Sequence, residues 1–374
     1  MIEDFDTKRI SNKYFNYPLK FLFMYTANEQ QLASFDKRHD YLASKLNLGK
    51  EILWLTKEQC IKCGPSIDEI IAICEKAMIA HGKKEYEMPA KIGIHPYDDV
   101  FYHAMPGYLP NQHVIGMKWI ECFPKNPRKY GLPQTTGVII LNDIPTGVPI
   151  AIMDCTWVTA MRTPAVTALS AAALAPNTEY FGMFGAGVQG REHLRFIVHT
   201  LKKLKKIYLY GPHDDVVDKA IADIQPEIDV EIVKAKSPKE VAEKCETMAS
   251  ATIILRDPLC AVKDEWISKG QTILPLDMNT YFDLKTQYGC DKYIVDSIEE
   301  HQSFAEGGYF PADKGLPKVY CETGEILAGL KPGRERDDEI IVCSNIGMGL
   351  NDIAVGQYIM DKALEEGYGL RIPL

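Results

Sequence analysis

Apolar and polar positions follow two different patterns along the chain. From residue 180 onward, short apolar runs alternate with segments in which apolar residues recur every three to four positions, which is typical of strands followed by amphipathic helices. The expected strands are residues 180–184, 207–210, 230–233, 252–255, 272–275, 293–295 and 340–343, and the expected helices include 214–224, 238–245 and 352–366. Strands separated by helices predict a parallel, doubly wound α/β sheet.

Before residue 180 the pattern favours a separate α+β unit. The expected elements are a strand at 52–55, a helix at 66–82, a largely antiparallel sheet within 91–152 and an alanine-rich helix at 163–175. Ser66 and Glu69 fit a capping box at the start of the first helix. The first 50 residues are rich in aromatic and charged side chains and contain no chemical motif, so they fit either a packed arm or a partner surface.

The six residues from Gly185 to Gly190 read Gly-Ala-Gly-Val-Gln-Gly and stand between an expected strand and an expected helix. In this context the first glycine permits a tight turn, the second lets a pyrophosphate approach the backbone, and the third lets the helix lie close to the strand. The alternative is an ordinary glycine-rich turn. The order of strand, turn and helix favours a dinucleotide-binding Rossmann domain.

Composition is that of a globular protein with a large core. The chain has 374 residues, of which 46% are hydrophobic and 25% charged, so about two domains are expected. The net charge of -9 argues against a nucleic-acid partner, because phosphate binding relies on clustered Lys and Arg. The one dense basic run, 202–206, lies where the helix after the glycine turn should end and complements the helix dipole.

Cysteine usage and the apolar runs restrict the class of protein further. Ten cysteines without paired spacing, and no secretory leader, predict reduced thiols in the cytoplasm. Cys60 and Cys63 form a C-x-x-C pair without a second Cys or His pair, so incidental thiols are favoured over a zinc site and no metal is expected. The apolar region 148–175 is interrupted by Asp154 and Arg162, so no membrane partner is expected.

Several separate motifs resemble those of the ornithine cyclodeaminase and mu-crystallin family. They are Lys118-Trp119, Phe123-Pro124-Lys125-Asn126, Gly131-Leu132-Pro133, Met153-Asp154 to Arg162-Thr163, the Gly185 turn and the tail Gly347-Met348-Gly349-Leu350-Asn351-Asp352. The resemblance implies a Rossmann domain inserted in an α+β substrate and dimerisation domain, and therefore a homodimer. The implied boundaries are an N-terminal extension at 1–51, a substrate domain at 52–161 and 336–374, and a dinucleotide domain at 162–335.

The resemblance also implies which residues bind the substrate. Lys118 and Arg162 match the family residues that bind the substrate carboxylate, for which the planar guanidinium of Arg162 is well shaped. Lys91 falls where members have an arginine or lysine with the same task. Lys118 is also expected to be a catalytic residue. Without the resemblance, Lys118 would be interpreted as a lysine on an exposed sheet face and Lys91 as a surface lysine.

Asp277 follows an expected strand and matches the catalytic aspartate of the family. A carboxylate there would accept a proton from the substrate ammonium, leaving an amine whose lone pair assists hydride departure from Cα. The alternative role is a helix cap. His103 stands where ornithine cyclodeaminases carry a glutamate and is expected among the substrate-binding residues; it fits either a proton shuttle or a loop residue. Members often continue after the aspartate with Pro-Gly-Lys, whereas this chain has Met278-Asn279-Thr280.

The resemblance implies that the cofactor contacts come from the glycine turn and from neighbouring elements. The expected contacts are Gly185, Ala186, Gly187, Val188, Gln189, Arg162, Thr163, His213 and Asn345. An acid that would bind the ribose is missing after Tyr210, and no arginine is present there to bind a 2′-phosphate. Asp214 and Asp215 would repel such a phosphate, so NAD is favoured and NADP is not excluded.

The leading hypothesis is an NAD(P)-dependent oxidoreductase that moves hydride at Cα of a small amino acid or its imine, including cyclic imines. The alternative is an ornithine cyclodeaminase, in which a side-chain amine attacks the imine, ammonia leaves and the hydride returns, so that NAD is regenerated. The alternative of another class is a nucleotide-dependent or small-ligand binding protein without catalysis, as in mu-crystallin.

Overall fold

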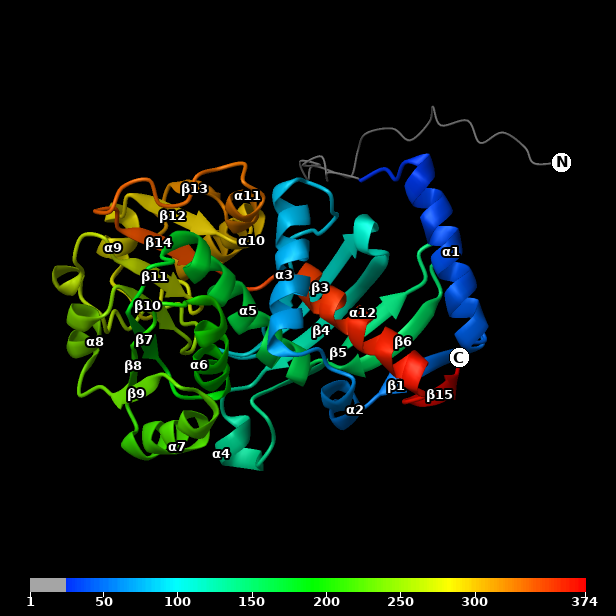
Figure 1. Cartoon of the computed structure of the whole chain (residues 1–374), viewed down its shortest axis with the longest axis horizontal. Coiled ribbons are helices and arrows are strands. Elements are labelled where there is room, and N and C mark those ends of the chain that lie inside the picture. Colours follow the sequence, from blue (N-terminus) through cyan, green and yellow to red (C-terminus); the bar gives the residue numbers. More distant parts are fainter. Residues whose placement is uncertain (1–24) are drawn as a thin grey trace.

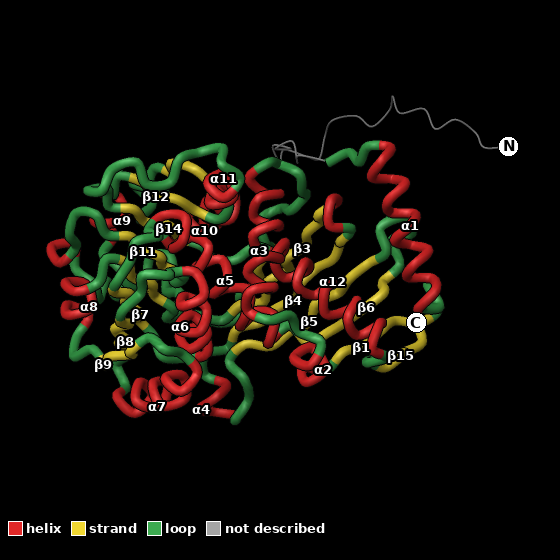
Figure 2. Tube along the Cα trace, in the orientation of Figure 1, coloured by secondary structure: helices red, strands yellow, loops and turns green. Residues whose placement is uncertain are grey.

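The computed structural model describes residues 25–374, so most of the aromatic segment at the start of the chain lies outside the described residues. The described chain builds two sheets that lie side by side (Figure 1). Helices α3 (Ile67–Gly82) and α5 (Thr156–Leu174) occupy the region between the two groups of strands (Figure 2). No helix within residues 25–374 is both long enough and apolar enough to cross a bilayer.

The first sheet has seven strands in the order β15-β1-β6-β5-β4-β3-β2. Its strands are β1 (Glu51–Leu55), β2 (Ile92–Ile94), β3 (Phe101–Leu109), β4 (Val114–Cys122), β5 (Thr135–Asn142), β6 (Pro149–Asp154) and β15 (Leu370–Pro373). The pairs from β2 to β6 are antiparallel, which confirms the expectation for residues 91–152. Strand β1 pairs parallel with β6.

Five helices accompany this sheet: α1 (Glu29–Lys45), α2 (Lys57–Lys62), α3, α4 (Asn126–Tyr130) and α12 (Gly349–Glu366). Helix α3 begins with the predicted capping box, because the Ser66 side chain accepts from the Glu69 backbone and Glu69 accepts from the Ser66 backbone. Helix α12 lies across strands β3 to β5 in Figure 1 and covers one face of the sheet. Along β4, buried residues alternate with half-buried ones, so every second residue lies on this covered face.

The second sheet has eight parallel strands in the order β13-β12-β14-β11-β10-β7-β8-β9. The strands are β7 (Tyr180–Phe184), β8 (Lys206–Tyr210), β9 (Glu231–Lys234), β10 (Thr247–Ser250), β11 (Thr272–Pro275), β12 (Lys292–Val295), β13 (Val319–Glu322) and β14 (Ile341–Ser344). The helices of this half are α5, α6 (Val188–Thr200), α7 (Asp214–Ile224), α8 (Pro238–Lys244), α9 (Leu284–Gly289), α10 (Ile298–Phe304) and α11 (Thr323–Leu327). The doubly wound α/β class is confirmed.

Two expected elements are wrong in position. The strand expected at 252–255 is a loop, and the strand of that unit is β10, all four of whose residues are buried. The apolar run at 252–255 has strand-forming side chains but lies beyond the edge of the sheet. The helix expected to begin at Thr163 begins at Thr156, because Pro164 lies inside α5 and does not start it.

The expected domain boundaries also need correction. A boundary after residue 335 assigns β14 to the substrate domain, yet β14 pairs with β11 and β12 in the eight-stranded sheet. A boundary after residue 161 divides α5. Residues before 52 are not a separate extension throughout, because Arg38 of α1 binds Asp361 of α12 at 2.5 Å. The physical reason is that α5 and its neighbours belong to one continuous apolar core, which joins Leu53, Ala165 and Phe181.

Candidate active site

Two predicted cations meet on one buried carboxylate. Lys118 lies on β4 at a position that faces α12, and its Nζ is 2.7 Å from Oδ2 of Asp352. Arg162 lies on α5 and donates from Nε to Oδ1 of the same aspartate at 3.0 Å. Lys118 is only 1% exposed, so the interpretation as a lysine on an exposed sheet face is wrong. Burying three charges requires such pairing, because an isolated buried ion is very costly.

The electrostatic state of Lys118 reflects this environment. Burial lowers the pKa of Lys118 to about 8, Arg162 contributes in the same direction, and Asp352 opposes the shift. Lysine is therefore still mostly cationic at neutral pH and loses its charge in mildly alkaline solution. Lys118 and Arg162 together oppose two positive groups to the single carboxylate of Asp352, so this cluster of three side chains has an excess of positive charge.

Gly347 lies between the third cation, Lys91, and Arg162. Lys91 donates from Nζ to the Gly347 carbonyl at 3.1 Å, and the Gly347 N–H donates to Oδ2 of Asp296 at 2.6 Å. A Cβ at Gly347 would lie 2.3 Å from the Arg162 guanidinium, and its φ of +95° also favours glycine. Lys91, Lys118 and Arg162 are thus brought together around Gly347 and Asp352, and their role in binding a substrate stays a prediction.

Lys91 has a carboxylate partner of its own. Its Nζ lies 3.6 Å from Oε2 of Glu300 on α10, and its side chain is only 6% exposed. The backbone N–H of Lys91 donates to Oε1 of Glu300 at 3.2 Å. The interpretation of Lys91 as a surface lysine is therefore wrong.

His103 lies in β3, so the interpretation as a loop residue is wrong. Its ring stacks on Phe101 with ring centres 4.0 Å apart and meets Phe304 edge-on at 6.2 Å. Burial lowers the pKa of His103 to about 2, and the cation on Lys91 adds to the effect. The imidazole is consequently neutral near pH 7, which does not suit the role of a proton shuttle through its cationic form.

Asp277 lies two residues beyond β11, at the carboxyl edge of the parallel sheet, where ligands bind in open α/β folds. Its Oδ1 accepts from the Ser250 hydroxyl at 2.6 Å, and its Oδ2 accepts from the backbone N–H of Thr252 at 3.1 Å and from the Thr252 hydroxyl. Burial raises the pKa of Asp277, whereas these hydrogen bonds lower it. It does not cap a helix, since the next helix, α9, is capped by Asp283.

The glycine turn packs closely on its surroundings at its first and last glycine and is open at the middle one. Gly185 has a φ of +105°, and a Cβ there would lie 2.6 Å from the Ala251 carbonyl oxygen. A Cβ at Gly190 would lie 1.9 Å from the Gly185 carbonyl oxygen, so this glycine permits close packing of α6 on β7. A Cβ at Gly187 meets nothing within 4 Å, which leaves the space in front of α6 open. Exposed Val188 begins α6, whose first N–H groups face that space.

The other expected cofactor residues lie in different surroundings. Gln189 donates to the Thr159 carbonyl at 3.1 Å and thereby links the start of α6 to α5, whereas Thr163 donates to the same carbonyl at 2.9 Å within α5 itself. His213 is exposed just before α7, beyond the end of β8. Asn345 is buried; its amide donates to Ser170 at 2.9 Å and accepts from Thr323 at 2.8 Å. Its role in cofactor binding stays a prediction, because the nitrogen and the oxygen of its side-chain amide both make hydrogen bonds to other buried side chains.

Sequence reasoning missed three residues of this site. Asp352 and Gly347 were part of the recognised tail motif, but no role followed from their spacing. Glu300 carried no signal at all, since a glutamate in a helical segment is typical of a solvated face. Each becomes visible only when α10 and α12 are packed against the cations.

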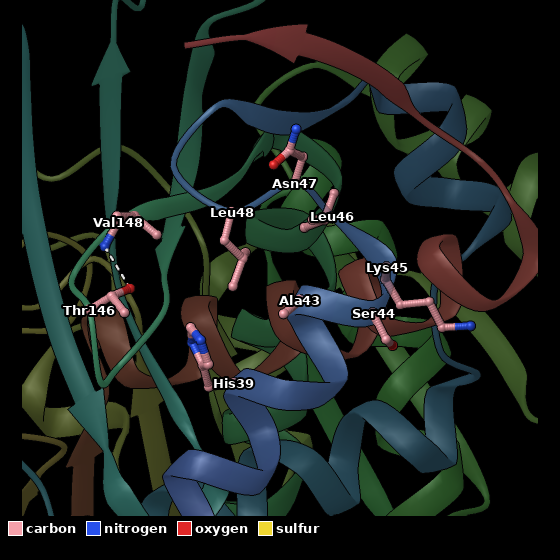
Figure 3. Close-up of a pocket in the computed structure, with 9 residues that line it drawn as sticks. All are labelled: His39, Ala43, Ser44, Lys45, Leu46, Asn47, Leu48, Thr146 and Val148. Carbon is pink, nitrogen blue, oxygen red and sulfur yellow. Dashed lines mark hydrogen bonds between the residues drawn. The ribbon is translucent and has the colours of Figure 1, made fainter.

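A surface hollow of about 650 Å³ lies between the end of α1 and the turn that joins β5 to β6 (Figure 3). It is lined by His39, Ala43, Ser44, Lys45, Leu46, Asn47, Leu48, Thr146 and Val148. His39 binds Asp143 at 2.8 Å beside it. None of the expected site residues lines this hollow, so its size does not make it the active site.

Comparisons with known proteins support the resemblance. An alanine dehydrogenase of Archaeoglobus fulgidus is 29% identical over 329 residues, which cover 86% of this chain and 98% of that protein. The structure of Thermococcus litoralis Δ1-pyrroline-2-carboxylate reductase in complex with NADH and L-proline is similar with a TM-score of 0.75 and 28% identity, over 86% of this chain and 100% of that chain. An archaeal alanine dehydrogenase dimer with bound NAD also gives 0.75 and 28%, over 86% of this chain and 99% of that chain.

The family assignment rests on most of the sequence. Residues 58–367 match the profile described as the ornithine cyclodeaminase/mu-crystallin family. This range includes the three cations, Asp277 and the glycine turn, and it leaves α1 outside. The chain therefore belongs to the ornithine cyclodeaminase/mu-crystallin family.

Proposed function

We propose that this protein is an NAD(P)-dependent oxidoreductase that transfers hydride between the nicotinamide and Cα of a small amino acid or its imine. The observation that carries this proposal is the meeting of Lys91, Lys118 and Arg162 around Gly347 and Asp352. Gly347 follows β14, whose carboxyl end lies at the same sheet edge as the glycine turn after β7. A carboxylate site and a dinucleotide site at one edge suit hydride transfer between their ligands.

In the proposed reaction, the three cations bind the substrate and Asp277 transfers the proton. Lys91, Lys118 and Arg162 bind the substrate carboxylate and fix the orientation of Cα. Asp277 accepts a proton from the substrate ammonium, and the freed lone pair forms the C=N bond as hydride leaves Cα for the nicotinamide. In the opposite direction the imine receives hydride at Cα, and the nitrogen receives the proton.

The similar proteins favour NAD as the cofactor, since NADH and NAD are bound in the two structures described above. The loop after β8 has no arginine for a 2′-phosphate, and Asp214 and Asp215 begin α7. Lys234 lies 3.3 Å from Asp214 and offsets part of that negative charge. We expect NADH to be used with a lower KM than NADPH.

The test is turnover with a defined panel. The purified protein is given NAD with L-alanine, L-proline or L-ornithine, and NADH with pyruvate plus ammonium or with Δ1-pyrroline-2-carboxylate. Net NADH change identifies a dehydrogenase or imine reductase. Formation of proline and ammonia from ornithine without net NADH identifies a cyclodeaminase. No turnover in any arm, together with tight ligand binding, favours the non-catalytic alternative.

The assigned role of Asp277 gives a separate prediction. Asp277→Asn should reduce kcat by about 10²- to 10⁴-fold, because a positioned proton acceptor is lost, while the Kd for NADH stays close to that of the wild type. Steady-state kinetics and fluorescence titration of NADH measure the two quantities. Ser250→Ala is the matched control, since it removes a hydrogen bond to the carboxylate and keeps the base. Full activity of Asp277→Asn would exclude the role.

We also propose that the protein is a homodimer. The face of the seven-stranded sheet opposite α12 carries half-buried apolar side chains, among them Met117, Ile140 and Ile152, which lie side by side on β4, β5 and β6. On the same face, Tyr102 and Trp119 stack with ring centres 5.7 Å apart. An apolar sheet face of this kind favours a partner, and an archaeal relative is a dimer.

A further inference from the structure

Glu300 is a buried carboxylate beside the substrate-binding cations that the proposed reaction does not use. Its side chain is 1% exposed. Oε1 accepts from the Lys91 backbone N–H at 3.2 Å, while Oε2 has no hydrogen-bond partner within residues 25–374. The Lys91 ammonium lies 3.6 Å from Oε2 and is also 5.4 Å from the centre of the Phe304 ring, one turn further along α10.

This contact joins the two halves of the molecule. Lys91 leads into β2, at the edge of the seven-stranded sheet, whereas Glu300 lies in the first turn of α10, which follows β12 of the eight-stranded sheet. Ser297 caps α10, and its side chain accepts from the Glu300 backbone N–H, which fixes the position of the Glu300 backbone. Glu300 is therefore held by its own helix and not by Lys91 alone.

The pairing of Lys91 with Glu300 is looser than that of the other two cations. Lys118 and Arg162 approach Asp352 to 2.7 and 3.0 Å, whereas the ammonium of Lys91 stays 3.6 Å from Glu300 and directs one hydrogen bond to the Gly347 carbonyl instead. An ammonium has three donors, so Lys91 retains donors for another acceptor. The ion pair between Lys91 and Glu300 is therefore easier for a substrate carboxylate to replace than the ion pairs that Lys118 and Arg162 make with Asp352.

We propose that Glu300 is the resident counter-ion of Lys91, and that it competes with the carboxylate of the substrate for this ammonium and so limits substrate affinity. The inference rests on the proposed function, since it requires that the ligand carries a carboxylate. Glu300 is a positioning residue, because it acts through Lys91. When Lys91 moves to the substrate, the carboxyl of Glu300 is left buried, and uptake of a proton removes the cost of that charge.

The local electrostatics agree with such an exchange. Burial raises the pKa of Glu300 and Asp296 adds to this, whereas Lys91 lowers it. Losing Lys91 removes the main group that favours the charged form. The neutral carboxyl keeps the hydrogen bond from the Lys91 backbone, because its carbonyl oxygen still accepts.

The test is Glu300→Gln, which keeps the size and the acceptor of the side chain and removes its charge. Calorimetric titration with L-alanine or L-proline, whichever the panel shows to be oxidised, is carried out on protein saturated with NADH, where no hydride acceptor is present. We expect the Kd to fall about tenfold in Glu300→Gln. In steady-state assays KM should fall by a similar factor, with kcat changed by less than about twofold.

Matched variants show whether the effect passes through Lys91. Glu299→Gln removes a charge from the exposed neighbour on the same helix and should leave the Kd unchanged. Lys91→Met should weaken binding, and adding Glu300→Gln to Lys91→Met should produce no further change, because the competitor has lost its target. A tenfold gain that persists in the Lys91→Met background would overturn the inference.

Three further results would overturn the inference, and one of them would also overturn the proposed function. An unchanged or raised Kd in a folded Glu300→Gln protein overturns the inference while leaving the proposed function intact. If Glu300→Gln does not fold, Glu300→Asp withdraws the carboxylate from Lys91 and should lower the Kd in the same direction; an unchanged Kd overturns the inference. If the wild-type protein neither turns over nor binds any member of the panel, both the inference and the proposed function fail.

Discussion

At the scale of single residues, the site depends on shared counter-ions. Asp352 lies 2.7 Å from the Lys118 ammonium and 3.0 Å from the Arg162 guanidinium and is the counter-ion of both. Breaking a buried pair is more damaging than never building it, because one uncompensated charge remains. Asp352 is therefore needed for the position of both cations before any ligand arrives.

Lys118 gives a pH-dependent prediction. Because burial lowers its pKa to about 8, the cation is present below that pH and is lost as the pH rises through it. The substrate KM should therefore rise above about pH 8, by up to about tenfold per pH unit. KM measured between pH 6.5 and 9.5 checks this.

Lys118→Met is the control for that profile. It should raise KM by about 10- to 100-fold at pH 7, since a charge-assisted hydrogen bond is lost, and it should abolish the rise near pH 8. A break that persists unchanged in Lys118→Met belongs to the ionising amine of the substrate and would contradict the assignment to Lys118.

The resemblance, and not the residue pattern by itself, predicted roles for Lys118, Arg162 and Asp277, and these roles stay predictions. It could not predict that Lys118 and Arg162 share Asp352, or that Lys91 faces Glu300, because those partners are set by the packing of α12 and α10. His103 was recognised by position, but its low pKa follows from burial between Phe101 and Phe304, which no local pattern reveals.

At the scale of elements, two glycines of the turn have different proposed roles: Gly187 leaves space for the cofactor, and Gly190 lets α6 pack on β7. Gly187 faces open space, whereas Gly190 lies against the Gly185 carbonyl. Gly187→Ala should leave the melting temperature nearly unchanged and weaken NADH binding by about tenfold or more, because its methyl group occupies the space of the pyrophosphate.

Gly190→Ala is the matched substitution and should act in the opposite way. A methyl group 1.9 Å from a carbonyl oxygen forces α6 away from β7, which should lower the free energy of unfolding by roughly 1 to 3 kcal/mol. Thermal unfolding and NADH titration of both variants give the comparison. Equal losses of cofactor affinity without any difference in stability would contradict this division of roles.

Much of the alternation of strands and helices after residue 180 was predicted from its periodicity, whereas α1, β13 and β15 were not expected. The exceptions have local causes. Residues 252–255 have β-branched and apolar side chains but leave the sheet, whereas β10, with Thr247 and Ser250 at its ends, is a fully buried strand despite its weaker pattern. Burial in the folded protein, and not the local sequence pattern, therefore determined which of the two segments forms the strand. The proline at 164 indicated a helix start, but α5 continues through it from Thr156.

At the scale of the whole molecule, the apolar face of the seven-stranded sheet is proposed to be the dimer interface. Ile140→Lys places a charge in the middle of this face, and burying an unpaired ammonium would be costly. We expect the wild-type protein to be a dimer in light scattering and Ile140→Lys to be a monomer. Val216→Lys on α7, where the side chain is 39% exposed, should remain a dimer. A monomeric wild-type protein, or a dimeric Ile140→Lys, would contradict the interface.

In the proposed reaction, hydride passes between the nicotinamide and Cα of the substrate. Isotope transfer is measured with NADH deuterated at both C4 positions, together with Δ1-pyrroline-2-carboxylate or with pyruvate plus ammonium. We expect an amino-acid product that is one mass unit heavier, with the deuterium at Cα. A product without deuterium at Cα, formed while the labelled NADH is consumed, would contradict the proposed hydride transfer.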